Sequence, residues 1–422
     1  MTNFVIPLKK TMRPAIRIDD YWYDLPEDRI AKYPLAHRDD SKLLVNLDGS
    51  SRDCLFKDIA EYLPSGALMV FNETKVVPAR LLFKRESGAL IEIFCLEPKD
   101  PADYQQAFAT TSSCVWKAIV GNARKWKGDT LSLYAEHIDN KDVKAVDLKA
   151  DLIGRDGNAF IVRFSWNGGA SFSQVMEMCG KIPIPPYLNR DTQPIDVTRY
   201  QTMYAKIEGS VAAPTAGLHF TERELNAIDS KGIERVKLCL HVGAGTFLPV
   251  KSEYIADHAM HGEPFSVDRE FLTRLARYAG KEIVAVGTTS IRSLESLYYL
   301  GVHCIERGEP GTVEQWEPYR DEGYGYSSVE AVNALIKYLD DNKLTSITSR
   351  TNLIIVPSYE FKFVTYMVTN FHQPKSTLLL LIAAAVGDCW KEMYRFAMDN
   401  GYRFLSYGDS SLLKVQHKFV LK

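Results

Sequence analysis

The sequence is poor in cysteine, has no long apolar run and carries no excess of positive charge. Its seven cysteines are scattered and include no C-x-x-C pair. This argues against a disulfide framework or a structural zinc site and favours a reducing compartment.

The longest apolar run, Leu378 to Val386, is far shorter than the roughly 20 residues that cross a bilayer. Met1 to Thr11 lack the apolar core of a signal peptide. We therefore expect a cytoplasmic protein without a membrane segment.

The formal net charge of −2 and the pI of about 6.5 exclude a general positive field that would attract nucleic acid. Any RNA contact must therefore come from a local patch. Basic residues with neighbouring aromatics occur at 124–127 and between Lys181 and Lys206. They could follow RNA phosphates while the rings stack on bases, or they could be solvated surface side chains. The candidate RNA-binding residues are Arg124, Lys125, Lys127, Arg199 and Lys206.

The pattern of apolar residues divides the chain into three regions. The hydrophobic fraction of 46% and the charged fraction of 25% are those of folded proteins, and 422 residues suffice for up to three domains. Short alternating strands between glycine turns in residues 81–166 indicate a small β-barrel or sandwich. Strands and helices alternate from about Val175 to the C-terminus, which indicates an α/β layer arrangement.

Two apolar segments are predicted to be strands, the first followed by a polar loop and the second by a helix. Ala67 to Phe71 is a continuous apolar strand, expected to be buried on both faces and followed by a polar loop at 72–75. Glu282 to Val286 is a second strand. The helix after it is expected over 291–300 and should end at Gly301, because glycine commonly follows the last helical residue.

The remaining C-terminal elements are predicted in the same way. Leu353 to Val356 is expected to form a strand, and Ser376 should cap a helix over 378–386. The polar stretch Tyr319 to Thr351 contains a predicted helix over 328–339. We interpret a region of about 301–350 as a surface insertion that could serve as a lid or docking element.

Two histidines lie in loops where chemistry could occur. His219 follows a run of small residues and precedes a helix whose capping box is Thr221 to Glu224. Small side chains let a ligand approach the backbone, and a helix N-terminus attracts anions. His241 ends a predicted strand before Gly243-Ala244-Gly245, at the edge where α/β proteins bind ligands. The alternative for each is an ordinary core histidine.

Three further loops have the same character. Thr288, Thr289 and Ser290 precede Arg292 at the start of a helix. Hydroxyls and a guanidinium suit a carboxylate or ribose, although a helix cap with a surface ion pair is the alternative. The loop 369–377 contains His372, and the segment 407–409 ends at Asp409.

A metal site receives little support from the sequence. His258, His261 and Glu263 are close together, but their spacing matches neither the H-E-x-x-H motif nor a structural zinc set. We therefore expect no metal. The histidines, the arginine and the hydroxyls at strand ends indicate an enzyme rather than a scaffold, without naming the reaction.

An ordered set of motifs resembles the signatures of the S-adenosylmethionine:tRNA ribosyltransferase-isomerases of queuosine biosynthesis. They run in the family's order over nearly the whole chain and comprise Asp24-Leu25-Pro26, Tyr33-Pro34-Leu35, Phe71 to Arg80, Tyr200 to Ala205, Gly209 to Phe220, His241 to Phe247, His258 to His261, Val286 to Glu295, Thr369 to Thr377 and Tyr402 to Asp409. The resemblance implies a large α/β catalytic domain formed by residues 1–80 and 167–422, with a small β-barrel domain at 81–166 inserted between them.

The resemblance also implies a reaction. The ribosyl part of S-adenosylmethionine is transferred to 7-aminomethyl-7-deazaguanine at the tRNA wobble position and isomerised, which gives epoxyqueuosine and releases adenine and methionine. S-adenosylmethionine is thus a consumed substrate, and no cofactor is expected. The expected partners are this substrate and the tRNA, and the protein is expected to be a monomer or a homodimer.

This chemistry suggests roles for the residues named above. The sulfonium acidifies the neighbouring ribose carbon, so a base must remove a proton, and protonation would help adenine to leave. We expect His219, His241 and His372 to transfer protons. Asp409 could bind the aminomethyl ammonium.

The remaining groups are expected to hold S-adenosylmethionine. Thr288 to Ser290 and Arg292 would bind its carboxylate or ribose, and an aromatic ring could face the sulfonium through a cation–π contact. The candidate rings are Phe220, Phe371 and Tyr407. The hypothesis requires these distant segments to converge on one cleft.

The sequence departs from the family pattern at a few positions. Lys181 and Gln373 stand where we expect His and Leu, and Pro357-Ser358-Tyr359 replaces an expected Pro-Gly-Tyr. The region from Leu300 to Thr351 is longer than in typical members. A paralogue with an altered acceptor is therefore one alternative. A non-catalytic tRNA-binding protein, against which the retained His219, His241, His372 and Arg292 speak, and a methyltransferase are the others.

Overall fold

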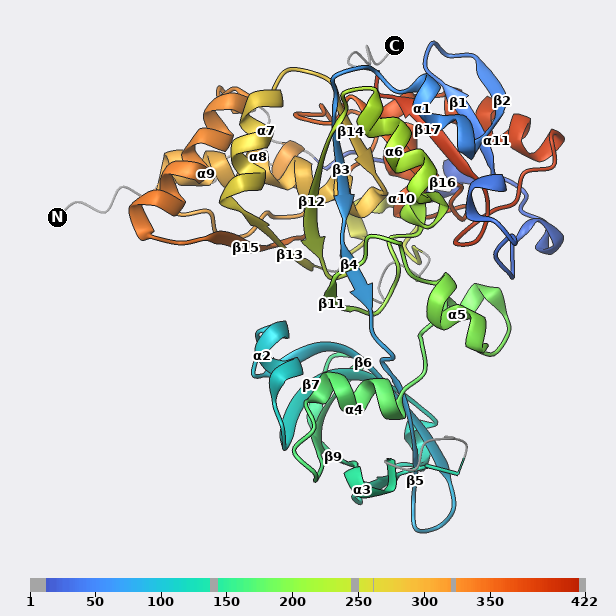
Figure 1. The fold of residues 1–422 in the computed structure, drawn as a ribbon, viewed down its shortest axis with the longest axis vertical. Coiled ribbons are helices and arrows are strands. Elements are labelled where there is room, and N and C mark those ends of the chain that lie inside the picture. The colour runs from blue at the N-terminus through green and yellow to red at the C-terminus, as the bar shows by residue number, and fades with distance from the viewer. Residues whose placement is uncertain (1–12, 137–142, 244–249, 261, 320–323, 417–422) are drawn as a thin grey trace.

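A computed structural model describes residues 13–136, 143–243, 250–260, 262–319 and 324–416. Figure 1 shows a large layered part that contains most of the helices and, below it, a smaller barrel that the chain enters through one strand and leaves through one helix. A nine-stranded sheet forms the centre of the large part, and six strands close the barrel. The expected mixed α/β fold with a small inserted barrel is confirmed. Within the described residues, no helix combines the length and apolar character needed to span a membrane.

The central strands of the large sheet are parallel and buried. In sheet order the strands are β15 (Ser346–Thr351), β13 (Glu263–Asp268), β12 (Glu234–Leu240), β3 (Leu68–Asn72), β14 (Ile283–Val286), β16 (Tyr366–Asn370), β17 (Ser410–Lys414), β1 (Lys42–Asn46) and β2 (Ser51–Leu55). β12, β3, β14 and β16 run parallel, whereas β13, β15 and β2 are antiparallel to their neighbours. Every residue of β3 is buried, as its apolar sequence predicts.

Alternate residues of β3 face two separate helical layers. Leu68 and Val70 pack into the larger core, which contains residues of α7 (Arg269–Tyr278), α8 (Thr288–Arg307), α9 (Ser328–Asn342), α10 (Thr377–Val386) and α11 (Cys389–Asp399). Met69 and Phe71 pack on the opposite face, where α1 (Ile59–Tyr62) and α6 (Glu222–Ser230) contribute apolar residues. This alternation follows from the two-residue period of a strand.

The barrel has its own aromatic core. Its strands in barrel order are β10 (Ala159–Ser165), β7 (Ser113–Gly121), β6 (Leu90–Asp100), β5 (Arg80–Lys84), β8 (Leu131–Leu133) and β9 (Lys149–Asp156), with α2 (Tyr104–Ala109), α3 (Val143–Val146) and α4 (Phe172–Cys179) beside them. The fully buried Trp116 packs against Phe172 of α4, with ring centroids 5.6 Å apart. Because α4 completes the barrel core, the domain limits expected at 80/81 and 166/167 stay a prediction.

The expected polar loop at 72–75 is wrong. Instead of leaving the fold after Asn72, the chain forms β4 (Thr74–Val76), which pairs in parallel with β11 (Ile207–Ser210). Thr74 is fully buried there. The polar residue types suggested a loop, but pairing with a distant segment provides the backbone partners that a buried strand requires.

The helix that was expected to end at Gly301 continues to Arg307 and is followed by Gly308 in the left-handed region, with φ of 84°. Gly301 serves a different purpose. A Cβ at this position would lie 2.2 Å from the carbonyl oxygen of Ala331 on α9. The glycine therefore allows two helices to approach closely and does not end the first one.

The region of about 301–350 is not a surface insertion. Its helix α9 packs on α8 in the larger core, and β15 pairs with β13 along its whole length. The strand expected at Leu353 to Val356 is also wrong, since this buried segment has no regular structure. A short apolar run indicates burial, but it does not by itself indicate a strand.

Gly301→Ala should destabilise the protein. The nearest atom to the new Cβ belongs to the α9 backbone, so a helix must shift, and overpacking of this kind costs about 1–3 kcal/mol. Thermal or urea unfolding measures the change. Gly325→Ala is the matched control, because no atom lies within 4 Å of a Cβ at that exposed position. Equal stability of the two variants would contradict the close approach of α8 and α9.

Candidate functional site

The loops singled out in the sequence follow parallel strands and meet at one edge of the sheet. Thr288 and Thr289 begin α8 directly after β14, and His372 comes two residues after β16. Residues from both loops line a pocket of about 90 Å³, which we call the edge pocket. Val242, after β12, and the small residues Ala212 to Ala216 complete much of its wall. Their convergence matches the rule that ligands bind at the carboxyl ends of parallel strands.

Within the described residues, two polar atoms at the edge pocket have no hydrogen-bond partner. They are the hydroxyl oxygen of Thr289 and the side-chain Oδ1 of Asn370, and both residues are more than nine-tenths buried. The hydroxyl of Ser290 is likewise buried without a partner. A buried polar group without a hydrogen bond costs free energy, so a polar ligand in this pocket would be favoured.

The N-terminus of α8 faces the same pocket. Gly287 stands at the N-cap with φ of 88°, and no side chain caps the helix. Uncapped N–H groups at the start of a 20-residue helix present partial positive charge. Together with the unpartnered Thr289 hydroxyl, this end of the pocket suits a carboxylate or another anion.

His372 is held in the wall of the edge pocket. Its Nε2 lies 2.9 Å from the Thr369 hydroxyl, and its backbone N–H donates to the hydroxyl of Tyr394. Burial lowers the pKa of His372 from 6.5 to about 3. The imidazole is therefore neutral at pH 7 and can accept a proton.

His219 lies in a neighbouring pocket. It is 5% exposed, and its Nδ1 lies 2.9 Å from the Ser41 hydroxyl. We call this second, smaller cavity of about 20 Å³ the arginine pocket, because Arg38, Arg199 and Arg403 line it beside His219. Burial, and then the charges of Arg403 and Arg38, lower the pKa of His219 to about 3.

The two pockets are connected through shared residues. Ser406 lines both of them. Asn370, in the wall of the edge pocket, donates from Nδ2 to His219 Nε2 at 3.2 Å. His219 and His372 thus lie in two separate but adjacent cavities, and the single cleft expected for all the site residues stays a prediction.

His241 lies elsewhere. It lines neither pocket, and its ring stacks on Tyr104 of the barrel helix α2 with centroids 4.2 Å apart. Gly209 leaves room for this ring, since a Cβ there would lie 2.4 Å from it. Burial lowers the pKa of His241 to about 4. The structure therefore places His241 at the junction between the barrel and the large sheet.

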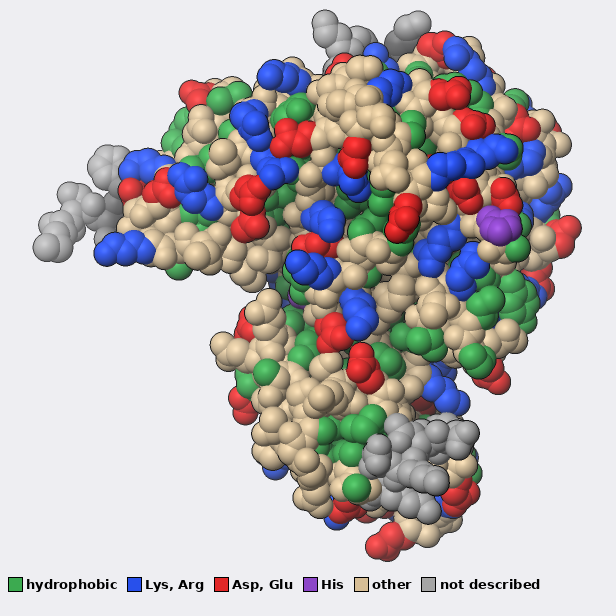
Figure 2. Space-filling model, in the orientation of Figure 1, with side chains coloured by type: hydrophobic (Ala, Val, Ile, Leu, Met, Phe, Trp, Pro, Cys, Tyr) green, Lys and Arg blue, Asp and Glu red, His purple; other side chains and the backbone are tan. Residues whose placement is uncertain are grey.

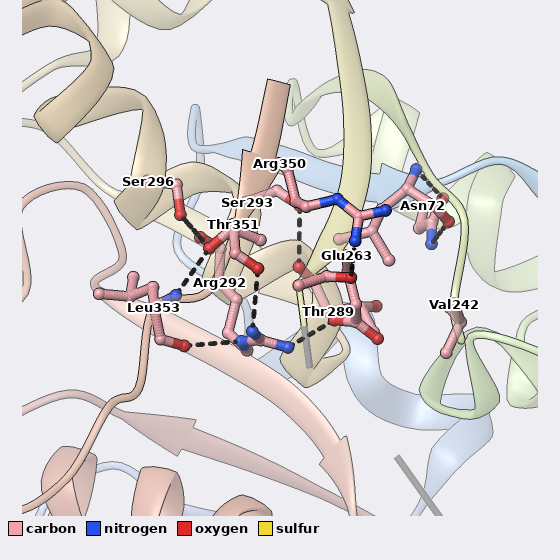
Figure 3. Close-up of polar contacts among 12 residues, drawn as sticks. Asn72, Val242, Glu263, Thr289, Arg292, Ser293, Ser296, Arg350, Thr351 and Leu353 are labelled. Carbon is pink, nitrogen blue, oxygen red and sulfur yellow. Dashed lines mark hydrogen bonds and ion pairs between the residues drawn. The ribbon is translucent and has the colours of Figure 1, made fainter. Parts of the chain in front are cut away.

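Arg292 is already paired inside the protein. Figure 3 shows its guanidinium between Glu263 and the carbonyl groups of Thr351 and Leu353. Arg292 and Glu263 are 5% and 3% exposed. Both line a third cavity of about 480 Å³, which touches the edge pocket through Leu378. A ligand carboxylate would have to share this arginine with Glu263.

The remaining candidates for the small-molecule site are all buried. Phe371 lines the edge pocket and Tyr407 lines the arginine pocket, where its hydroxyl donates to Asp196. Phe220 lines neither pocket and packs edge-on against Phe56 and Phe71. The Asp409 carboxylate accepts backbone hydrogen bonds from Lys42 and Arg403.

Asp409 also forms an ion pair with the Arg403 side chain, 3.1 Å away. An ammonium group would therefore have to compete for this carboxylate.

The RNA-binding candidates fall into separate places. Arg124, Lys125 and Lys127 are exposed on the barrel. Arg199 ends α5 (Pro194–Arg199) on the large part, and Lys206 is exposed beyond it. Among the described residues, the barrel group lies apart from the arginine pocket that Arg199 lines.

The metal alternative rests partly on residues outside the described range. His261 is not described, and neither are Ala244 and Gly245 of the turn after His241. Within the described part of the chain, no group of three His, Cys, Asp or Glu side chains could hold a metal ion.

Several residues of the site were not predicted. Ser41, Asn370 and Ser406 orient or connect the histidines, and Arg38 contributes charge. Asn370 lies in a segment that the sequence singled out, and its place at a strand end was the available signal. Ser41 and Arg38 come from near the N-terminus, and nothing in their local sequence points to His219.

Comparison with known proteins gives a family for the whole chain. A family model described as "Queuosine biosynthesis protein" matches residues 18–413. The S-adenosylmethionine:tRNA ribosyltransferase-isomerase of Halothermothrix orenii is 36% identical over 94% of this chain and 100% of its own length. The protein of that name from Syntrophomonas wolfei is 37% identical over 94% of this chain and 97% of its own.

A solved structure is also similar. It is the S-adenosylmethionine tRNA ribosyltransferase of Thermotoga maritima, which is 27% identical over 93% of this chain and 99% of that one, with a TM-score of 0.44.

The buried histidines predict that the protein becomes less stable in weak acid. His219 and His372 have pKa values of about 3 in the folded state, against 6.5 ordinarily. The unfolded chain therefore takes up protons below pH 6.5 that the folded protein does not. The free energy of unfolding should fall as the pH drops from about 7 toward 4, by up to about 1.4 kcal/mol per pH unit for each histidine.

Thermal unfolding between pH 7 and pH 5 measures this loss. His372→Gln should reduce the slope of melting temperature against pH. A variant with the same slope as the unchanged protein would show that burial does not hold His372 neutral.

Proposed function

The chain belongs to the queuosine biosynthesis family of S-adenosylmethionine:tRNA ribosyltransferase-isomerases, and from this premise we propose that it transfers the ribosyl part of S-adenosylmethionine to tRNA. The acceptor is 7-aminomethyl-7-deazaguanine at the wobble position. Isomerisation of the ribosyl group gives epoxyqueuosine, with adenine and methionine released. The observation that carries this proposal is the family match, which extends from residue 18 to residue 413 and includes every loop of the edge pocket.

The cavities support a substrate of this size and polarity. The edge pocket, at about 90 Å³, has room for only a part of S-adenosylmethionine, but the adjoining cavity of about 480 Å³ has room for the nucleoside part. Leu378 belongs to both walls, so the two cavities are neighbours, and we propose that one molecule extends across them. In this arrangement the start of α8 and the Thr289 hydroxyl bind the methionine carboxylate.

The neutral histidines support the proton transfers. The sulfonium acidifies the neighbouring ribose carbon, and a buried imidazole can accept the proton from it. Because burial gives His219 and His372 pKa values of about 3, either one becomes a strong acid once it is protonated. The proton is then readily delivered to the departing adenine.

The other residues proposed to contact the substrate lie at or beside three different cavities. Phe371 is the aromatic candidate in the wall of the edge pocket, and we propose that it faces the sulfonium. We propose that Arg292 contacts the substrate in the larger cavity, where its charge is partly neutralised by the ion pair with Glu263. Tyr407 and Asp409 belong to the arginine-pocket side, near Arg403.

A paralogue that accepts a different RNA base is the second candidate, motivated by Lys181 and Gln373. Lys181 forms an isolated bridge with Arg80 where the chain enters the barrel, and Gln373 lines the edge pocket. Gln373 can therefore contact a ligand in the edge pocket, whereas Lys181 lines neither the edge pocket nor the arginine pocket.

The reaction can be tested directly with purified protein and S-adenosylmethionine labelled in its methyl group. Adenine should be released only when tRNA with the 7-aminomethyl-7-deazaguanine base is present, and the label should leave as methionine. Label that enters the RNA would instead show a methyltransferase. Absence of adenine release with this tRNA, but release with another, would indicate the paralogue.

Substitution of the histidines should separate their roles. His219→Ala and His372→Ala should each lower kcat about 10²- to 10⁴-fold, which is the usual contribution of a general acid or base. His241→Ala should mainly raise KM for tRNA and lower the melting temperature, because its ring holds the barrel against the sheet. Single-turnover kinetics with saturating tRNA measures the difference. Normal kcat in both His219→Ala and His372→Ala would remove their catalytic roles.

A further inference from the structure

The arginine pocket contains positive charge that the protein does not neutralise. Arg38 donates to the carbonyl oxygens of Gln201 (2.6 Å) and Thr198 (2.9 Å), and Arg199 donates to those of Leu35 (2.6 Å) and Ala36 (3.0 Å). These acceptors are uncharged. Within the described residues, neither arginine forms an ion pair with a carboxylate.

Three acidic side chains nearby already have cationic partners. Asp196 is bound by Arg190, Asp39 lies 3.5 Å from Arg223, and Asp409 pairs with Arg403. The Nε of Arg199 is buried and has no hydrogen-bond partner among the described residues. Burial and the neighbouring Arg199 charge lower the pKa of Arg38, as expected for two cations that face one cavity. The cavity of about 20 Å³ between them has room for a group about the size of one water, so a single phosphate oxygen placed there would gain both charges.

The surface around these arginines is apolar and exposed. Tyr33, Ile195 and Val197 are 49%, 45% and 55% exposed. The Arg199 contacts to Leu35 and Ala36 hold the segment after Tyr33 against α5, so these side chains belong to one surface. Figure 2 shows hydrophobic side chains over α5 with Lys and Arg side chains beside them. Positive charge next to exposed apolar and aromatic groups suits a nucleic acid strand with unstacked bases.

We propose that Arg38 and Arg199 form a phosphate-binding site for an RNA strand, and that Arg403, which lines the same cavity, completes it. The proposal rests on the proposed function and extends it, because it names where the tRNA backbone is held. The ligand is a phosphodiester of the anticodon loop. Since Ser406 lines both the arginine pocket and the edge pocket, a phosphate held here brings its nucleotide next to the reaction site.

The proposal can be tested by the salt dependence of RNA binding. Fluorescence anisotropy with an anticodon stem-loop RNA, over a range of NaCl concentrations, gives the slope of log affinity against log salt. Arg38→Gln and Arg199→Gln should each lower affinity about tenfold and reduce the slope by about 1, the change expected when one phosphate contact is lost. Arg269→Gln, which removes an exposed arginine paired with Asp340, is the control and should leave the slope unchanged.

Lysine substitutions distinguish phosphate binding from a purely structural role. Arg38→Lys and Arg199→Lys keep the charge but lose most of the hydrogen bonds to carbonyl groups. If the site binds phosphate, the lysine variants retain the salt slope that the glutamine variants lose. If both arginines only brace the backbone, lysine and glutamine lower the melting temperature alike and neither changes the slope, which overturns the proposal.

Two further measurements distinguish an RNA site from a site for free phosphate and from the reaction itself. Calorimetric titration with inorganic phosphate tests a site for free phosphate. Variants that lose phosphate binding but bind RNA normally would overturn the assignment to RNA.

Adenine release tests the reaction. If the enzyme releases adenine but its Arg→Gln variants keep the slope of log affinity against log salt, only the arginine site is rejected. If the protein releases no adenine but its Arg→Gln variants lose that slope, only the proposed reaction is rejected.

Discussion

The burial of α8 is the constraint on which the rest of the large domain depends. Residues Thr288 to His303 of this helix are buried, so each charged side chain on it needs a partner inside the protein. Glu295 accepts hydrogen bonds from the Tyr359 hydroxyl and from the backbone N–H groups of Lys362, Phe363 and Val364. Arg292 pairs with Glu263, and the polar His303 ring forms a hydrogen bond with the Glu317 carboxylate. These bonds fix three segments around one helix.

The reaction site benefits from the same constraint. Because α8 cannot move without breaking these buried bonds, its first turn is held rigidly at the carboxyl edge of the sheet. The edge pocket therefore has a fixed wall at Thr288 and Thr289, while its remaining walls include Ala212 to Ala216, Val242 after β12 and the loop after β16. Polar groups held in place before a ligand binds cost little reorganisation. The barrel is tied to this frame through the Tyr104–His241 stack and the Arg350–Glu97 ion pair.

The sequence predicted what depends on local pattern. The buried strand β3, the Ser376 cap of α10 and the Thr221 capping box of α6 all follow from residues within one or two turns. Gly301 shows the limit, because a glycine that ends a helix and one that admits a second helix look the same in sequence. For the same reason β15 looked like part of an insertion, since its partner β13 lies far away in the chain.

The site residues also divide into those predicted from local sequence and those whose positions depend on the tertiary fold. His219 and His372 were predicted from their places beside strand ends and helix starts, which is local information. The position of His241 depends on Tyr104, which comes from the inserted barrel, and no pattern around His241 reveals that neighbour. Arg38 reaches His219 only because segments near residues 38, 199 and 218 fold together. Convergence of three distant segments is a property of the tertiary fold.

The two proposals are linked through the electrostatics of His219. The charges of Arg403 and Arg38 act with burial to hold its pKa low, so in the unbound protein it is a poor base. A phosphate bound by Arg38 and Arg199 would offset that positive charge and raise the pKa of the imidazole. His219 would then accept a proton more readily when RNA is bound than when it is absent. The arginines would thus bind the acceptor and also make His219 a better base in the complex than in the unbound protein.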